Sequence, residues 1–135
     1  MKAVAFIRKI TWSIPVLLDC GDYNGYVAIP PGNKYYGKSY GEITLDIDVY
    51  GGLTYSEPVI LGEKTFVAGI PISPEYIGKR NYILEDAEYI TDNTEIGDDW
   101  WIFGFDTMHH GDTPEEWGRE AVIEETKRLM RQLNG

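Results

Sequence analysis

Both faces of the stretch WWIFGF, at positions 100–105, carry large hydrophobic side chains. Alternate side chains of an extended strand point to opposite sides. Here the two sets are Trp100 and Ile102 on one face, and Trp101, Phe103 and Phe105 on the other. A strand that is apolar on both faces is typical of the centre of a sheet, so this stretch predicts a central strand. Gly104 within it indicates a bulge or the close approach of a neighbour.

Glycine and proline punctuate the first two-thirds of the chain and divide it into segments typical of strands and turns. The clearest alternation of apolar and polar residues lies at 42–50, and its apolar members are Ile43, Leu45, Ile47 and Val49. Gly51 and Gly52 follow, and then LTYS, so we expect a β-hairpin over residues 42–57. Further strands are expected at 25–30, 65–70 and 81–90.

The hydrophobic period changes after Thr113. Thr113 fits an N-cap, Pro114 the first helical position and Glu116 the third residue of a capping box. Apolar residues then recur at helical spacing, at Trp117, Ala121, Val122, Leu129 and Leu133. This pattern predicts a C-terminal helix of about 20 residues. The fold class expected is therefore α+β, a mainly antiparallel sheet with one long C-terminal helix packed on it.

Length and composition indicate a single globular domain over residues 1–135, large enough for its own hydrophobic core. Cys20 is the one cysteine, so no internal disulfide forms and a cytosolic location is expected. No secretory signal is evident, and no apolar run approaches the roughly 20 residues of a membrane span. The 12 basic and 22 acidic residues give a net charge of −10, which argues against duplex nucleic acid and favours basic partners.

Polar residues directly after the aromatic strand form the first candidate site. Asp106, His109 and Asp112 offer two carboxylates and an imidazole within seven residues, a set that could hold a divalent metal or perform acid-base catalysis. The alternative is structural, because aspartates in turns often bind backbone amides and favour helix N-termini. In that case the three residues form a hydrogen-bonded cluster beside the turn at 50–52, which fixes the corner between strand and helix.

A loop rich in lysine and tyrosine, PPGNKYYGKSY at 30–40, forms the second candidate site. Lysines supply point charges for a phosphate and tyrosines supply flat faces for a base, which together suggest a nucleotide pocket. Alternatively, the tyrosines simply close the edge of the sheet. The ligand-binding candidates are Lys34, Tyr36, Lys38, Tyr50, Tyr55 and His109. The chain has no P-loop or dinucleotide fingerprint, and no cofactor is expected.

Residues 81–99 carry acidic side chains without one lysine or arginine. Such a run could imitate a phosphate backbone and occupy a basic groove on a host protein. More often a run of like charge is a solvated surface.

Three segments carry a family resemblance: GYVAIPPGNKYYGKSY at 25–40, YGGLTYS at 50–56 and WWIFGFDTMHHGD at 100–112. With them, the chain resembles a group of small uncharacterised proteins of bacteriophages and prophages, over most of residues 24–133. The resemblance implies a phage origin and a compact α+β domain, and it carries no established activity. Tyr50 and Asn33 stand where the family pattern has histidine.

These observations together favour a phage accessory protein that acts by binding rather than by catalysis, in counter-defence within the host cytoplasm. It would sequester a small nucleotide-like ligand or block a basic host protein. One alternative is a small metal-dependent hydrolase that uses Asp106, His109 and Asp112, and another is a structural or assembly factor. Self-association into a homo-oligomer stays open.

Overall fold

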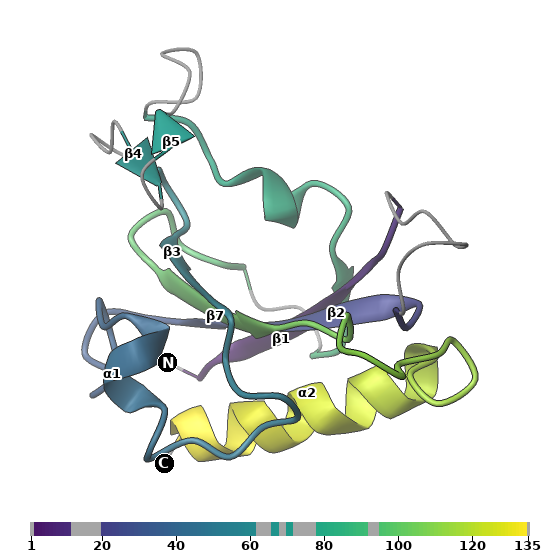
Figure 1. The fold of residues 1–135 in the computed structure, drawn as a ribbon. Helices are drawn as coiled ribbons and strands as arrows, with labels where there is room; N and C mark the ends of the chain where they lie inside the picture. Colours follow the sequence, from purple (N-terminus) through teal and green to yellow (C-terminus); the bar gives the residue numbers. More distant parts are fainter. Residues whose placement is uncertain are drawn as a thin grey trace.

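The computed structural model describes residues 2–11, 20–61, 66–67, 70–71, 78–91 and 95–134. Its strands are β1 (Val4–Lys9), β2 (Tyr23–Ile29), β3 (Tyr55–Pro58), β4 (Phe66–Val67), β5 (Ile70–Pro71), β6 (Glu88–Tyr89) and β7 (Trp101–Phe105). Its helices are α1 (Tyr40–Ile43) and α2 (Arg119–Asn134), with a 3₁₀ turn at Tyr82–Leu84 (Figure 1). No helix of these described ranges is long and apolar enough to cross a membrane.

Five strands form one antiparallel sheet in the order β3-β7-β2-β1-β6, and β4 and β5 form a separate pair. β7 lies between β3 and β2, so the prediction of a central strand at 100–105 is confirmed. α2 runs across one face of the sheet and contacts β1 and β2 (Figure 1). The α+β class with a long C-terminal helix packed on the sheet is therefore confirmed.

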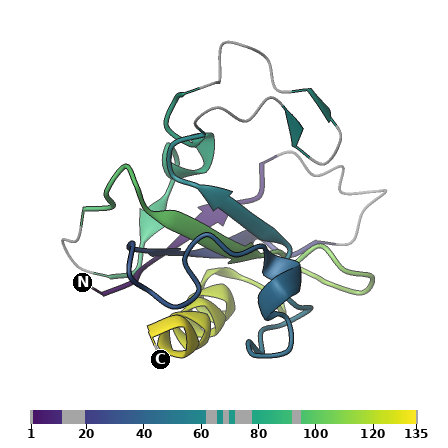
Figure 2. The same cartoon turned by 90° about the vertical axis from the view of Figure 1, so that its left-hand side faces the viewer.

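Both faces of the sheet are covered, which explains why β7 is apolar on both sides. Phe103 and Phe105 are buried on the face that α2 covers, together with Val122, Leu129 and Leu133 of the helix. Trp100 and Ile102 are buried on the opposite face, against Ile83 of the 3₁₀ turn. Figure 2 shows α2 on one side of the sheet and this turn on the other. The chain thus builds two hydrophobic layers from a single sheet.

Two glycines in the strands allow neighbours to approach closely. A Cβ at Gly104 would lie 2.5 Å from the ring of Tyr26, so the close approach expected at this position is confirmed. A Cβ at Gly25 in β2 would overlap Thr126 of α2 and the ring of Phe105. Gly25 therefore sets how closely the helix can dock on the sheet.

The predicted hairpin over residues 42–57 is wrong. Its first half is the helix α1 followed by turns, and Leu45, expected to be buried, is fully exposed (100%). Ile43 and Ile47 are buried, and the amide of Ile47 donates to the carbonyl oxygen of Ile43 (3.2 Å). Ile43 and Ile47 are four positions apart, a separation that places two side chains on one face of a helix as well as on one face of a strand. In this protein the segment takes the helical turn. The second half forms β3, which pairs with β7 instead.

The other strand predictions had mixed outcomes. The strand at 25–30 is confirmed by β2, and β4 and β5 lie within or beside 65–70, where the other residues fall outside the described ranges. The prediction of a strand at 81–90 is wrong for most of this segment, because a 3₁₀ turn precedes the short β6. β1 was not predicted at all, although its residues from Val4 to Ile7 are completely buried.

The C-terminal helix is shorter at its start than predicted. Thr113 does accept a hydrogen bond from the Glu116 amide (3.2 Å), but the helix begins at Arg119 and has 16 residues. The carbonyl oxygen of Trp117 accepts a hydrogen bond from the amide of Asp22 (2.9 Å). This bond ties the turn that follows Thr113 to the residue before β2, and α2 begins two residues after Trp117.

We expect Gly25→Ala to lower the free energy of unfolding by about 1–3 kcal/mol, because the added methyl group must displace α2 or Phe105. The matched control is Gly41→Ala in α1, where the nearest atom to the new Cβ would be 4.0 Å away. The control should change stability by less than about 1 kcal/mol. Urea denaturation measures both. Equal effects of the two substitutions would contradict the packing described for Gly25.

Candidate functional site

Asp112 is the centre of a polar cluster where the chain leaves β7, which we call the Asp112 corner (Tyr50, Asp106, His109 and Asp112). One carboxylate oxygen of Asp112 accepts hydrogen bonds from the amide of His109 (2.8 Å) and lies 3.1 Å from its ring Nδ1. The other accepts a hydrogen bond from the Tyr50 hydroxyl. The predicted hydrogen-bonded cluster is therefore present for His109, Asp112 and Tyr50, and it ties the end of β7 to the turn at 50–52. Asp106 lies beside it without a hydrogen bond to the other three side chains.

The surroundings of Asp112 favour its ionised form. Burial by itself would raise the pKa of Asp112, but the hydrogen bonds from Tyr50 and from the backbone and ring of His109 outweigh it and lower this pKa. The hydrogen bond that Tyr50 donates to Asp112 also raises the pKa of the Tyr50 hydroxyl, which stays protonated. An ionised carboxylate that faces Nδ1 accepts a hydrogen bond from the N–H of that nitrogen. The tautomer of the ring that donates this bond carries its lone pair at Nε2.

The two carboxylates of the corner lie on opposite sides of the His109 ring. Nε2 is 3.7 Å from Asp106 Oδ1, whereas Nδ1 faces Asp112. The three predicted metal ligands therefore do not converge on one point. Across the described part of the chain, no group of three or more His, Cys, Asp or Glu side chains is placed to hold a metal ion.

The turn at 50–52 is packed against His109 and held by α2. The Tyr50 ring contacts the His109 ring edge-on, with centroids 5.1 Å apart, and also lies against Trp117 (4.2 Å). Its amide donates to Glu125 Oε2 of α2 (2.6 Å). Hydrogen bonds from Arg128 keep the pKa of Glu125 below its usual value. Gly51 has a φ of +70°, and a side chain there would overlap the His109 ring.

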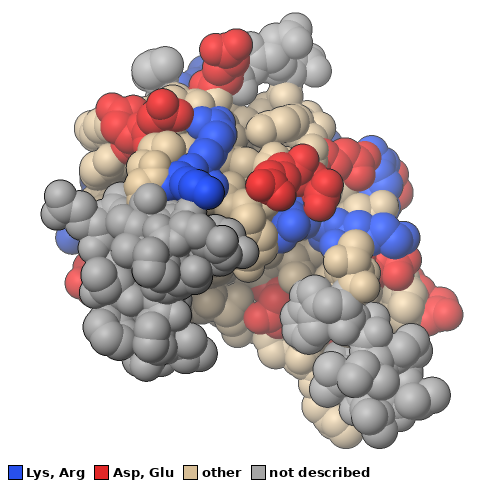
Figure 3. All heavy atoms as spheres, turned by 90° about the horizontal axis from the view of Figure 1, so that it is seen from above, with Lys and Arg blue, Asp and Glu red and all other residues tan. Residues whose placement is uncertain are grey.

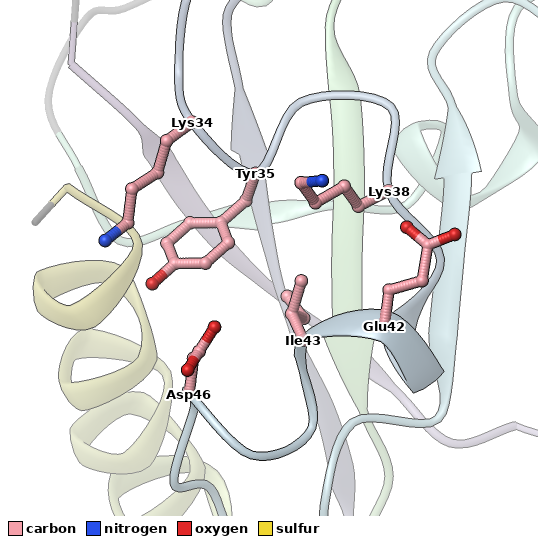
Figure 4. A pocket seen from close by; sticks show the side chains of 6 residues that line it. All are labelled: Lys34, Tyr35, Lys38, Glu42, Ile43 and Asp46. Carbon is pink, nitrogen blue, oxygen red and sulfur yellow. The ribbon is translucent and has the colours of Figure 1, made fainter.

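The loop between β2 and α1 forms a hollow of about 250 Å³, which we call the lysine hollow. It is lined by Lys34, Tyr35, Lys38, Glu42, Ile43 and Asp46 (Figure 4). Tyr35 and Ile43 are buried and supply the apolar part, and the four charged side chains surround it. The Lys34 ammonium lies 4.9 Å from the centre of the Tyr35 ring. Among the described residues, none of these four charged groups forms an ion pair with another side chain.

Two hydrogen bonds fix the loop that carries the lysines. The side-chain amide of Asn33 donates to the carbonyl oxygen of Leu133 near the end of α2 (2.8 Å). The indole of Trp101 donates to the carbonyl oxygen of Lys38 (2.9 Å). The positions of Lys34 and Lys38 are thus set by the helix on one side and by the central strand on the other.

The six predicted ligand-binding residues do not form one site. Lys34 and Lys38 line the lysine hollow, and Tyr50 and His109 belong to the Asp112 corner. The Tyr36 hydroxyl donates to the carbonyl oxygen of Asp99. Tyr55 accepts a hydrogen bond from Asn81 (2.6 Å) on the sheet face away from α2, where burial raises the pKa of its hydroxyl. No residue is shared between the hollow and the corner.

Three residues that line the lysine hollow were not predicted: Glu42, Ile43 and Asp46. Tyr35 belongs to the predicted loop at 30–40. Glu42 and Asp46 are four residues apart, a spacing that brings side chains together on a helical turn but separates them along a strand. The signal was present, but the alternation around them was interpreted as β structure.

Arginines from outside the acidic run at 81–99 pair with several of its carboxylates. Arg80 binds Asp98 (2.8 Å), and Arg119 donates from Nε to Glu88 (2.6 Å). Arg8 lies 3.9 Å from Asp86. In the view from above, basic and acidic side chains lie side by side (Figure 3). The sequence does not show these pairs, because Arg8 and Arg119 come from distant positions and Arg80 pairs with a residue at the far end of the run.

Comparison with protein-family models, curated proteins and solved structures finds no match to this chain.

We expect Tyr50→Phe to lower the free energy of unfolding by about 1–3 kcal/mol, because it leaves the buried Asp112 carboxylate without one of its donors. Tyr40→Phe is the control, since Tyr40 is 43% exposed. This control should change stability by less than about 0.5 kcal/mol. Chemical denaturation at neutral pH tests the pair. If Tyr50→Phe were as stable as the parent, the hydroxyl would have no part in holding the corner.

Proposed function

We propose that the protein is a bacteriophage accessory protein that acts by binding and sequesters a small phosphorylated, nucleotide-like ligand in the lysine hollow. The observation that supports this most is the pair of lysines, Lys34 and Lys38, on one hollow without an ion-pair partner among the described side chains. The phage origin, the action in counter-defence and the place of action, the host cytoplasm, follow from the motif resemblance.

The chemistry of the lysine hollow suits a phosphate better than an uncharged ligand. Lysine ammonium groups bind phosphate as point charges, and two of them here face a hollow with an apolar base. Glu42 and Asp46 on the same rim can accept hydrogen bonds from amino or hydroxyl groups of the ligand. A ligand that carries both an anionic group and hydrogen-bond donors would bind to all four charged side chains of the hollow.

The size of the lysine hollow limits how much of the ligand it encloses. At about 250 Å³ it is smaller than the roughly 300–1,000 Å³ of sites that bury a drug-sized molecule. It would therefore enclose the phosphate end, and the remainder would lie on the surface. Affinity would come mainly from charge, so it should weaken as salt concentration rises.

Small-ligand binding is favoured here over blocking of a basic host protein. The acidic run at 81–99 would bind a basic protein best if its carboxylates had no other ion-pair partners. Arg80, Arg119 and Arg8 already neutralise part of this surface. An imitation of a phosphate backbone would have to break these ion pairs.

We expect the double variant Lys34→Gln/Lys38→Gln to bind adenosine monophosphate at least about tenfold more weakly than the parent, a loss of about 1.4 kcal/mol. The loss follows from the removal of both positive charges at the lysine hollow. Isothermal titration calorimetry at low salt measures it, with inorganic phosphate as a second probe for the phosphate contribution.

Lys127→Gln is the matched control, because it removes the same charge from α2 at a residue that does not line the hollow. It should bind like the parent. An equal loss in this control would assign the effect to net charge alone. If the parent bound neither probe, the lysine hollow would not be a phosphate site.

A further inference from the structure

The two ring nitrogens of His109 have different surroundings. Nδ1 lies 3.1 Å from the buried Asp112 carboxylate, which also binds the His109 amide. Nε2 faces Asp106, and both of these side chains are about one-third exposed (33% and 31%). Asp112 thus fixes the rotation of the ring and keeps the proton on Nδ1, which leaves the Nε2 lone pair on the side of Asp106.

Between His109 Nε2 and Asp106 Oδ1 there is a gap that neither group closes. Their separation of 3.7 Å is too long for a direct hydrogen bond. In the tautomer with the proton on Nδ1, both atoms present electron pairs, so a group that accepts an electron pair from each would be stabilised between them. The Oδ1 atom also accepts the Met108 amide (3.1 Å), which holds the carboxylate in this orientation.

We propose that His109 Nε2 and the Asp106 carboxylate bind a divalent transition-metal ion of the zinc class, with Asp112 as the residue that orients the imidazole. This site goes beyond the proposed ligand binding and shares no residue with the lysine hollow. It also differs from the ligand set expected from the sequence, because Asp112 acts through the ring and does not contact the ion.

The geometry fits such an ion. Zinc bonds to nitrogen and oxygen of about 2.0–2.2 Å, at a tetrahedral angle, place the two donor atoms roughly 3.4 Å apart. The observed 3.7 Å requires a shift of only a few tenths of an ångström. A histidine that binds a metal commonly donates its other ring N–H to a carboxylate, and Asp112 occupies that position.

Gly51 packs close to the His109 ring at Nε2, where only a glycine leaves room for the ring. A Cβ at this position would overlap His109 at Nε2 and at the adjacent ring carbon. Two protein ligands leave two positions of a tetrahedral shell for water or for an atom of a bound molecule. The two flanking carboxylates and the net charge of −10 both favour a cation here.

The test uses the full chain, freed of metal by chelation, and zinc ion alone as the probe in calorimetry. The parent should bind one equivalent, and His109→Gln should weaken binding at least tenfold. His110→Gln is the matched control, because the chain has only these two histidines and His110 is exposed. Its affinity should stay within about twofold of the parent.

Asp106→Asn keeps an oxygen to accept the Met108 amide and leaves Asp112 untouched, so this variant should fold normally. It should nevertheless lose at least tenfold in zinc affinity. Asp112→Asn should lose about 10- to 100-fold through misorientation of the ring. Cobalt substitution gives a second readout, since the visible spectrum reports a tetrahedral site that includes nitrogen. Parental zinc affinity in both His109→Gln and Asp106→Asn, or no binding by the parent at submillimolar zinc, would overturn the proposal.

Discussion

The burial of β7 on both faces and both edges is the constraint on which the rest of the structure depends. A strand with aromatic residues on each side cannot face water, so α2 must cover one face and the segment around the 3₁₀ turn the other. β2 and β3 then satisfy its backbone groups on either edge. The position where β7 ends consequently determines where the Asp112 corner can form.

The segment between α1 and β3 connects the two candidate sites. Its first part supplies Asp46 to the lysine hollow, beside Glu42 of α1, and its middle part supplies Tyr50 and Gly51 to the corner. The sites are chemically different: one presents two lysine ammonium groups beside two carboxylates, whereas the other presents an imidazole nitrogen between two carboxylates. A single loop thus places two complementary chemistries on separate parts of the surface.

The sequence predicted what depends on hydrophobic pattern and missed what depends on tertiary contacts. The two-sided strand and the C-terminal helix were found because their periods are unambiguous. The helical structure of the segment with Ile43 and Ile47 was not found. Apolar residues at every second position fit a strand, but two of them that are four positions apart fit a helical turn equally well. The corner was predicted from the order of its polar residues, but the opposite placement of Asp106 and Asp112 around His109 depends on the Tyr50 contact, which local spacing does not encode.

Side chains of α2 take the role of a partner strand for the backbone at 48–50. Gln132 accepts from the Asp48 amide and donates to the Asp48 carbonyl oxygen (both 2.7 Å), and Glu125 accepts from the Tyr50 amide. These amides become accessible to solvent only when the helix side chains release them. Undocking of α2 would therefore also leave three backbone groups of this loop without partners, so the helix and the loop stabilise each other.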